Sequence, residues 1–187
     1  YAGVSHIDVE NLNDAEAAAS LNACKDKGIE ISALAYYPNP MDGDLAKRQA
    51  NISHLRQVIA ASAKLGVGRV TTFIGRDQTQ TVEANLELFR QLWPPIIAYA
   101  ESLGVQVAIE NCPMLFGRDQ WPGGQNLATS PRIWRQMLRS SPAATSASTS
   151  TRRTSSGRGW TTSARCMNSR IACSTCTSRT SRCSPRS

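Results

Sequence analysis

The chain has 187 residues, and its formal net charge of +7 averages two unlike parts: residues 1–119 carry 10 Lys and Arg against 14 Asp and Glu, whereas residues 120–187 carry 11 Arg and no acidic residue. This length predicts one domain, or one domain followed by a tail. The apolar runs fall short of the roughly 20 residues of a membrane span, so this sequence shows no transmembrane segment, although a segment before Tyr1 stays open. The early Cys are sparse, which argues against a disulfide-rich fold and favours a reducing, cytoplasmic location.

Helical and strand patterns alternate along residues 15–139. The expected elements, in chain order, are a helix at 15–27, a strand within 27–37, a helix at 47–65, a strand within 65–75, a helix at 79–93, a further helical segment at 96–103, a strand within 103–111 and a helix beginning at 131. Pro94-Pro95 is expected to break or kink the helix at 79–93, and Ser130 to cap the last helix.

Each predicted strand is preceded by a Gly, at position 28, 66 or 104. Gly is the residue that the end of a helix prefers, so the repeated pattern predicts a helix, its C-cap and then a strand. Strands that alternate with helices in this way indicate βαβ units around a parallel sheet.

The residues at the strand ends decide between an open sheet and a barrel. No strand is followed by the G-x-G-x-x-G motif of a dinucleotide-binding sheet. Polar and aromatic side chains stand at the strand ends instead, which is typical of a (β/α) barrel with its active site at that face. Because such barrels have about 250 residues, about half of one is readable. These strand-end residues are Tyr36, Tyr37, Asn39, Arg76, Asp77, Glu110 and Asn111.

Several stretches resemble a known family. "ALAYYPNPMD", "NISHLRQVIAASAKLGVGRVTTFIG", "LWPPIIAYAESLGVQVAIENCPM" and "WPGGQNLATSP" are similar to the sugar phosphate isomerase/epimerase family, which are xylose isomerase-like TIM barrels. The resemblance covers most of residues 5–139. It implies a divalent cation (Mn, Mg, Co or Zn) at the barrel mouth, and the interconversion of aldoses and ketoses, or their epimerisation, through an enediolate or a hydride shift.

Glu110 is the strongest candidate for a functional residue. It ends an apolar strand, where a carboxylate is costly unless it is bound to a metal, hydrogen-bonded or solvated. By the resemblance it matches the first metal-ligand Glu of these barrels, and hard divalent cations take oxygen ligands. The alternative is a strand-end Glu in a salt bridge. No catalytic acid or base is assigned, because the family takes its second carboxylate from the last strand.

Five further residues are candidates for contacts with a sugar substrate. Tyr36, Tyr37 and Asn39 end a strand, although the two rings could equally pack at a turn. Asn111 neighbours Glu110, and Arg118 could hold a phosphate through its guanidinium group. The loop "WPGGQN" that comes after Arg118 could join it, or could only make a turn.

Residues 140–187 have a different composition, rich in Arg, Ser and Thr, and are predicted to be a disordered tail. When the reading frame is moved back by one base, the codons from Ser150 to Gly157 permit Asp-Pro-Ser-His-Leu-Val-Trp, and those from Ser174 to Thr180 permit His-Val-His-Val-Lys-Asp. Both motifs belong to the family pattern and stand in the family order. We therefore hypothesise that the chain from near Leu138 onward is a frame-shifted translation of the second half of a barrel.

Three functions remain open from the sequence. The first is a sugar isomerase or epimerase. In this hypothesis the present chain lacks most of the metal ligands and is inactive. The second is a non-enzymatic fragment. The third is a metal-dependent, endonuclease-like barrel whose basic tail binds nucleic acid; it is disfavoured because "FIGRD" carries no His and the tail has no Lys. A zinc site at Cys173 and Cys176 is weaker still, because Cys166 and Cys183 lack paired spacing. The oligomeric state is open.

Overall fold

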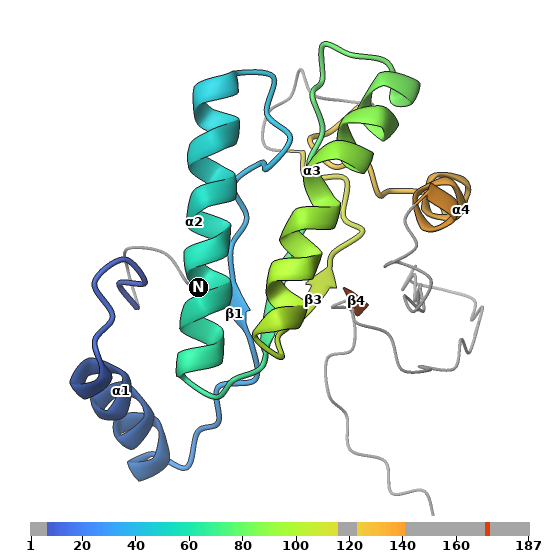
Figure 1. Ribbon diagram of the computed structural model, residues 1–187. Helices are drawn as coiled ribbons and strands as arrows, with labels where there is room; N and C mark the ends of the chain where they lie inside the picture. The colour runs from blue at the N-terminus through green and yellow to red at the C-terminus, as the bar shows by residue number, and fades with distance from the viewer. Residues whose placement is uncertain (1–6, 116–122, 141–170, 173–187) are drawn as a thin grey trace, which may run out of the picture.

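Helices alternate with parallel strands in the fold, which we describe from a computed structural model covering residues 7–115, 123–140 and 171–172. The elements, coloured along the chain in Figure 1, are α1 (Asp14–Asp26), β1 (Leu34–Ala35), α2 (Leu45–Lys64), β2 (Arg69–Thr72), α3 (Val82–Ser102), β3 (Gln106–Ile109), α4 (Pro131–Ser140) and β4 (Ile171–Ala172). None of the helices in these ranges is long and apolar enough to cross a membrane.

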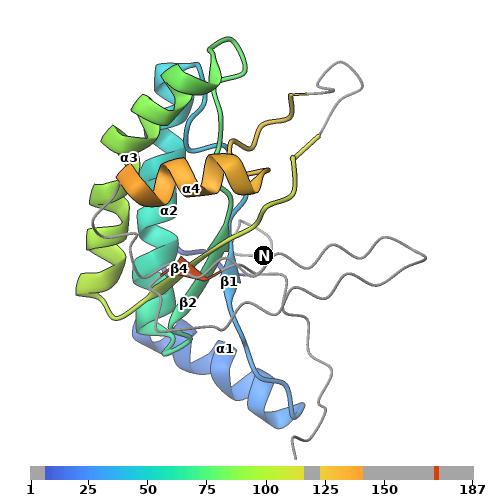
Figure 2. The same cartoon turned by 90° about the vertical axis from the view of Figure 1, so that its right-hand side faces the viewer.

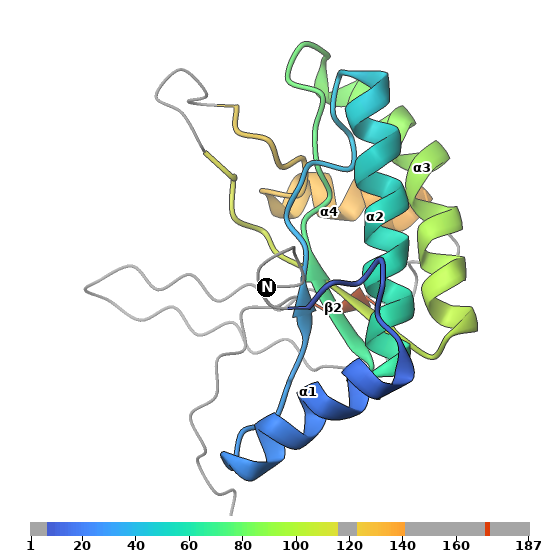
Figure 3. The same ribbon diagram turned by 90° about the vertical axis from the view of Figure 1, so that its left-hand side faces the viewer.

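The strands form one parallel sheet in the order β1-β2-β3-β4. Leu34 pairs with Val70, and Val70 in turn pairs with Val107. Helices α2 and α3 lie side by side on one face of this sheet, as Figures 2 and 3 show from opposite sides. A parallel sheet in sequence order, with its connecting helices on one face, is the arrangement of a partial (β/α) barrel. The predicted fold class is therefore confirmed.

Alternate residues of the strands face the helices. Val70, Val107 and Ile109 are fully buried in the apolar core that also contains Leu55 and Ile59 of α2. Side chains alternate across a strand, so the residues between these positions lie on the opposite face, which becomes the inside of a barrel. The two faces of the sheet thus separate the packing residues from the residues that can reach the barrel interior.

Three helices end in the same way, as the Gly pattern predicts. Gly28, Gly66 and Gly104 have φ values of 65°, 66° and 69°. At the second of these, the Gly66 N–H donates to Ala63 O at 3.0 Å and the Val67 N–H donates to Ser62 O at 3.0 Å. This pair of bonds is a Schellman motif, which satisfies the last helical carbonyls and turns the chain into the next strand.

Substitution of Gly66 by Ala is expected to lower the free energy of unfolding by about 1 kcal/mol, because an L-residue with a side chain disfavours this positive φ. An added Cβ would meet no atom within 4 Å, so the loss comes from the backbone and not from a clash. Urea unfolding measures it. Gly66→Asn, which tolerates the left-handed conformation, is the matched control and should lose less. Equal losses for both variants would contradict a backbone origin of the effect.

Helix α3 passes through Pro94 and Pro95 without ending. The predicted kink is seen as a change of direction along α3 in Figures 1 and 2, whereas the predicted separate helix at 96–103 is wrong because its residues continue α3. Each Pro removes one N–H from the helix ladder. Trp93, Ile96 and Ile97 are all buried around the two prolines, so packing holds the helix together through the kink.

One short strand lies inside the region predicted as the tail. Ile171 and Ala172 form β4, and they pair in parallel with Val107 and Ala108 of β3. The rest of the tail after Ser140 lies outside the described residues. The domain boundary at 139/140 and the frame-shift hypothesis therefore stay predictions.

Candidate functional site

The carboxyl ends of β1, β2 and β3 meet at one edge of the sheet, where the candidate residues were expected. Glu110 directly follows β3, and its N–H donates to Thr72 O at 2.8 Å, so the ladder with β2 continues through it. Ile109 is buried against the helices, which places Glu110 on the opposite, inner face by alternation. The half-buried Glu110 therefore sits at the mouth of the partial barrel.

The two neighbouring tyrosines lie on different faces. The ring of Tyr37 stacks on Phe73, with ring centroids 6.3 Å apart; Phe73 follows β2 and lies on the inner face. Tyr36 belongs to the apolar core on the helix side, and its ring stacks on His54 of α2 at 4.7 Å. Tyr37 thus shares a face with Glu110 and Tyr36 does not. As substrate contacts, both remain predictions.

Tyr36 is part of a small cluster with His54 and Glu10. Nδ1 of His54 lies 3.3 Å from Oε1 of Glu10, which precedes α1. These three residues line one side of a cavity of about 370 Å³. Burial of the phenol, followed by the nearby Glu10 carboxylate, raises the pKa of Tyr36 to about 12. Tyr36 is accordingly a neutral packing group at ordinary pH.

Tyr36 is expected to ionise about two pH units later than an ordinary Tyr. A folded pKa raised above the ordinary value of 10.0 means that stability is fully present below pH 10.0 and is lost as the pH rises through about 12. Absorbance of tyrosinate during an alkaline titration measures this. The late phase should vanish in Tyr36→Phe and persist in Tyr99→Phe; its persistence in Tyr36→Phe would refute the assignment.

Asn39 joins the loop after β1 to the loop after β2. Its Nδ2 donates to Arg76 O at 2.8 Å, and its Oδ1 accepts from the N–H of Arg76 at 3.1 Å and of Met41 at 3.0 Å. Gly75 has a φ of 87°, and an added Cβ there would lie 2.9 Å from Met41 N. The side-chain amide of Asn39 is therefore occupied by main-chain partners, and its predicted contact with a sugar stays a prediction.

Asn85 of α3 also binds the main chain of the loop after β2 through its side-chain amide. Its Oδ1 accepts from the Asp77 N–H at 2.8 Å, and its Nδ2 donates to Asp77 O at 2.8 Å and Thr81 O at 2.9 Å. Asn85 has no exposed surface. This loop is thereby fastened to the first turn of α3.

Asn126 holds the loop after β3, and it was not among the predicted site residues. Its Nδ2 donates to Glu110 O at 2.9 Å and to Cys112 O at 2.7 Å, and its Oδ1 accepts from the Ala128 N–H at 3.0 Å. The one sequence signal that could have found it is its place in "WPGGQN", which was considered a substrate loop or a simple turn. Three buried asparagines thus fix the three strand-end loops.

A cleft of about 300 Å³ opens between these loops, beside Asn39, Asp42, Asp77 and Gln125. Its carboxylates are engaged locally: Asp42 Oδ1 accepts from the Asp44 N–H at 2.9 Å, and Asp77 Oδ1 accepts from Thr79 Oγ1 at 2.7 Å. No group of three His, Cys, Asp or Glu that could hold a metal ion occurs within the described ranges. The predicted Arg118 lies outside those ranges, and Asn111 is half-buried next to Glu110.

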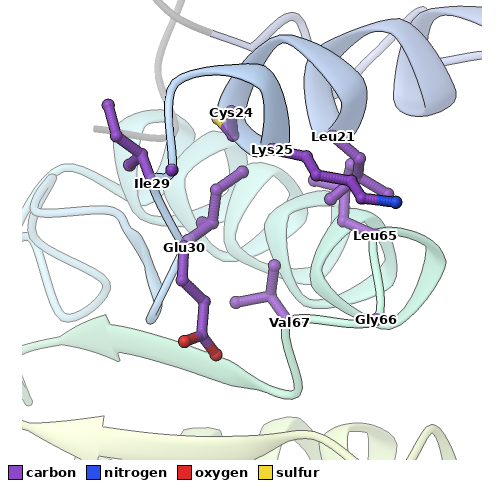
Figure 4. Close-up of a pocket in the computed structure, with 10 residues that line it drawn as sticks. Leu21, Cys24, Lys25, Ile29, Glu30, Leu65, Gly66 and Val67 are labelled. Atoms are coloured by element: carbon purple, nitrogen blue, oxygen red, sulfur yellow. The ribbon is translucent and has the colours of Figure 1, made fainter.

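A cavity of about 400 Å³ lies at the opposite end of the sheet, between the end of α1 and the turn from α2 into β2. Figure 4 shows its lining, in which the apolar Leu21, Ile29, Leu65 and Val67 lie beside the charged side chains of Lys25 and Glu30. The amino-terminal end of a barrel serves stability, whereas chemistry is carried out at the carboxyl end. The strand-end loops therefore remain the candidate site.

Comparison with known proteins gives one family. Residues 1–135 match the family model described as xylose isomerase-like TIM barrel. No curated protein matches the chain significantly.

Two solved structures with TM-scores above 0.5 agree with this fold, and a third is similar to it at a lower score. A D-psicose 3-epimerase with D-tagatose from Clostridium cellulolyticum H10 is 15% identical with a TM-score of 0.52, covering 71% of this chain and 46% of that one. A protein from Sinorhizobium meliloti 1021 is 15% identical with a TM-score of 0.51, covering 67% and 45%. A xylose isomerase-like TIM barrel protein from Mycobacterium smegmatis in complex with magnesium is 14% identical with a TM-score of 0.48, covering 69% and 43%. The chain spans less than half the length of each of these proteins.

Proposed function

Because the chain belongs to the xylose isomerase-like TIM barrel family, we propose that its site is built for the metal-dependent isomerisation or epimerisation of a sugar or a sugar-like polyol. The observation that carries this proposal is the half-buried Glu110 carboxylate at the carboxyl end of β3, on the inner face of the partial barrel. The similar D-psicose 3-epimerase structure with D-tagatose supports the choice of substrate class.

Among the described residues, the Glu110 carboxylate can serve as one ligand of a divalent cation. Glu110 offers the oxygen donors that Mg²⁺ and Mn²⁺ prefer. A bound cation supplies Lewis-acid stabilisation of the negative charge that develops on the substrate oxygens. The family resemblance implies Mn, Mg, Co or Zn, and a single carboxylate does not select one of these four metals. A single carboxylate leaves most of the coordination to water, so we propose that this chain binds such a cation weakly.

The other candidate residues contact the substrate or support the site in this proposal. Tyr37, on the same face as Glu110, would contact the sugar through its ring and hydroxyl group. Asn111 and Arg118 would hold hydroxyl or phosphate groups of the substrate through hydrogen bonds. Asn39 would act mainly by fixing the loops after β1 and β2, since its amide is already used. Tyr36 would contribute only by packing.

For the 187-residue chain itself we propose an inactive product of a frame-shifted gene. The second carboxylate and the His ligands that the family pattern requires are permitted only by the shifted frame. A non-enzymatic fragment is therefore the second candidate function, and the absence of acidic residues after 119 favours it. A nuclease role has no comparable support, because its case depends on Arg residues that are out of frame in this hypothesis. We place the protein in the cytoplasm, with a small sugar as its partner.

Paramagnetic broadening by Mn²⁺ tests the role of Glu110. When Mn²⁺ is titrated into the ¹⁵N-labelled chain, the amide signals around residues 109–112 should broaden before those at the amino-terminal end of the sheet. Glu110→Gln, which keeps the shape and removes the charge, should abolish this local broadening. Glu101→Gln, on the outer helix α3, is the matched control and should leave it unchanged. Equal broadening in the Glu110→Gln protein would refute the proposal.

A further inference from the structure

The main chain that carries Glu110 leaves the sheet immediately after it, and a second segment takes over the hydrogen bonds that the sheet no longer supplies. The Gln125 N–H donates to Met114 O at 3.1 Å, and the Asn126 N–H donates to Pro113 O at 3.3 Å. Nearer to β3, the side chain of Asn126 continues this series by donating to Cys112 O and Glu110 O. The side chain of Asn126 thus binds the main chain at Glu110 and at Cys112, on either side of Asn111.

Asn is the residue type that this arrangement requires. Both N–H groups of its amide are used on carbonyl oxygens, and its oxygen accepts from the Ala128 N–H at 3.0 Å. Asp has no donor for the two carbonyls, and Ser has one hydroxyl in place of the three-way contact. Asn126 is 2% exposed, so water cannot replace the lost bonds without entering the loop.

The holding segment is itself anchored to the neighbouring strand end. The Leu127 N–H donates to Gly75 O at 3.0 Å, next to the end of β2. Met114 has a φ of 55°, a left-handed conformation that a residue with a side chain rarely adopts. Such a conformation persists where surrounding contacts impose it, and it is common beside functional groups. The main chain from Glu110 to Met114 is therefore held in place by residues 125–127.

We infer that Asn126 is a positioning residue, which directs the Glu110 carboxylate toward the barrel mouth by fixing the main chain beyond it. This inference rests on the proposed role of Glu110 as a metal ligand. The Cα–Cβ direction of a residue depends on its backbone, so a loop free to rotate after Glu110 would spread its carboxylate over several directions. Partners that orient a ligand typically change metal affinity by about 10-fold to 100-fold when removed.

The experiment compares two buried asparagines in the full chain with Mn²⁺ as the probe. Asn126→Ala is expected to raise the Mn²⁺ dissociation constant, measured by broadening at residues 109–112, by about 10-fold. Asn85→Ala removes from α3 an equally buried side chain that makes four main-chain bonds to the loop after β2, against three for Asn126. It should leave this constant within about 2-fold although it also lowers stability. Equal changes in the two variants would show that Asn126 is merely structural and would overturn the inference.

Two further variants separate failure of the positioning role from failure of the metal role. Asn126→Ser keeps an acceptor for the Ala128 N–H and is used if Asn126→Ala does not fold; the same rise in the dissociation constant is expected. Glu110→Gln reports on the proposed function alone. If it leaves the broadening unchanged, the metal role of Glu110 fails; if it abolishes the broadening while Asn126 variants bind Mn²⁺ normally, only the positioning role fails.

Discussion

A gene whose reading frame is restored by a single-base change near the codon of Leu138 is expected to encode an active enzyme, whereas the 187-residue chain is expected to show no turnover. The restored frame permits the Glu, His and Asp that a divalent cation needs beside Glu110. General acid–base catalysis alone contributes about 10²-fold to 10⁴-fold, so we expect the difference between the two proteins to exceed about 100-fold. Turnover of a panel of ketoses, with Mn²⁺ and then with a chelator, measures it.

Two controls make this result specific. Glu110→Gln in the restored protein should lose activity, which ties the chemistry to the carboxylate at the end of β3. Sequencing of the coding DNA tests the premise independently, since an intact frame with no nearby insertion or deletion would end the hypothesis. Equal, metal-dependent activity of the 187-residue chain would contradict both the frame-shift hypothesis and the prediction that this chain lacks most metal ligands.

Local signals were enough to predict most of the helices and their alternation with parallel strands. The helix predicted at 47–65 is α2, and the Ala-rich helix predicted at 15–27 is α1. The reason is that helix ends are set within a few residues by caps: Asn13 and Glu16 form a capping box at α1, and Ser130 Oγ accepts from the Ile133 N–H at 3.3 Å. Such caps are visible in sequence because their partners lie three residues apart.

The ends of the strands within their apolar runs were not predicted, because they are decided by distant residues. The apolar run within 65–75 gives only Arg69–Thr72 as β2. Beyond Thr72 the chain is bonded by Asn39 and Asn85, which are 37 and 8 residues away from their partners. A propensity pattern cannot show which side chain will replace a ladder hydrogen bond. The loop-fixing role of the three asparagines was therefore not predicted, although Asn39 had been named as a substrate contact, and Asn126 was missed as a single residue for this reason.

The division of Tyr36 and Tyr37 between two faces could have been read from strand alternation. Consecutive side chains of a strand point to opposite faces, so only one of two adjacent tyrosines can face a barrel interior. Leu34 and Tyr36 share the helix side, which leaves Tyr37 for the interior. At the level of sequence the two rings were treated alike, as substrate contacts or as a packed pair, and this constraint was not used to separate them.

Substitution of Trp93 by Ala is expected to lower the free energy of unfolding by about 3–5 kcal/mol, the largest stability effect that we predict. Trp93 is 1% exposed, and its ring packs 6.3 Å from the ring of Phe89. Its Nε1 donates to Ile74 O at 3.0 Å, which links α3 to the segment just after β2. The loss is a large fraction of the roughly 5–15 kcal/mol that stabilises a typical domain. Urea unfolding followed by far-ultraviolet circular dichroism measures it.

The position next to Pro94 and Pro95 gives Trp93 a second role. Those prolines cannot donate to the helix ladder, so the kinked part of α3 depends on side chains that clamp it to the sheet. Trp93→Phe keeps most of the packing and loses the bond to Ile74 O, and should therefore cost about 1–3 kcal/mol for an unpaired buried carbonyl. Leu103→Ala, at a residue 39% exposed, should change stability by less than about 0.5 kcal/mol. If Trp93→Ala were as mild as Leu103→Ala, α3 would be held to the sheet by something other than this clamp.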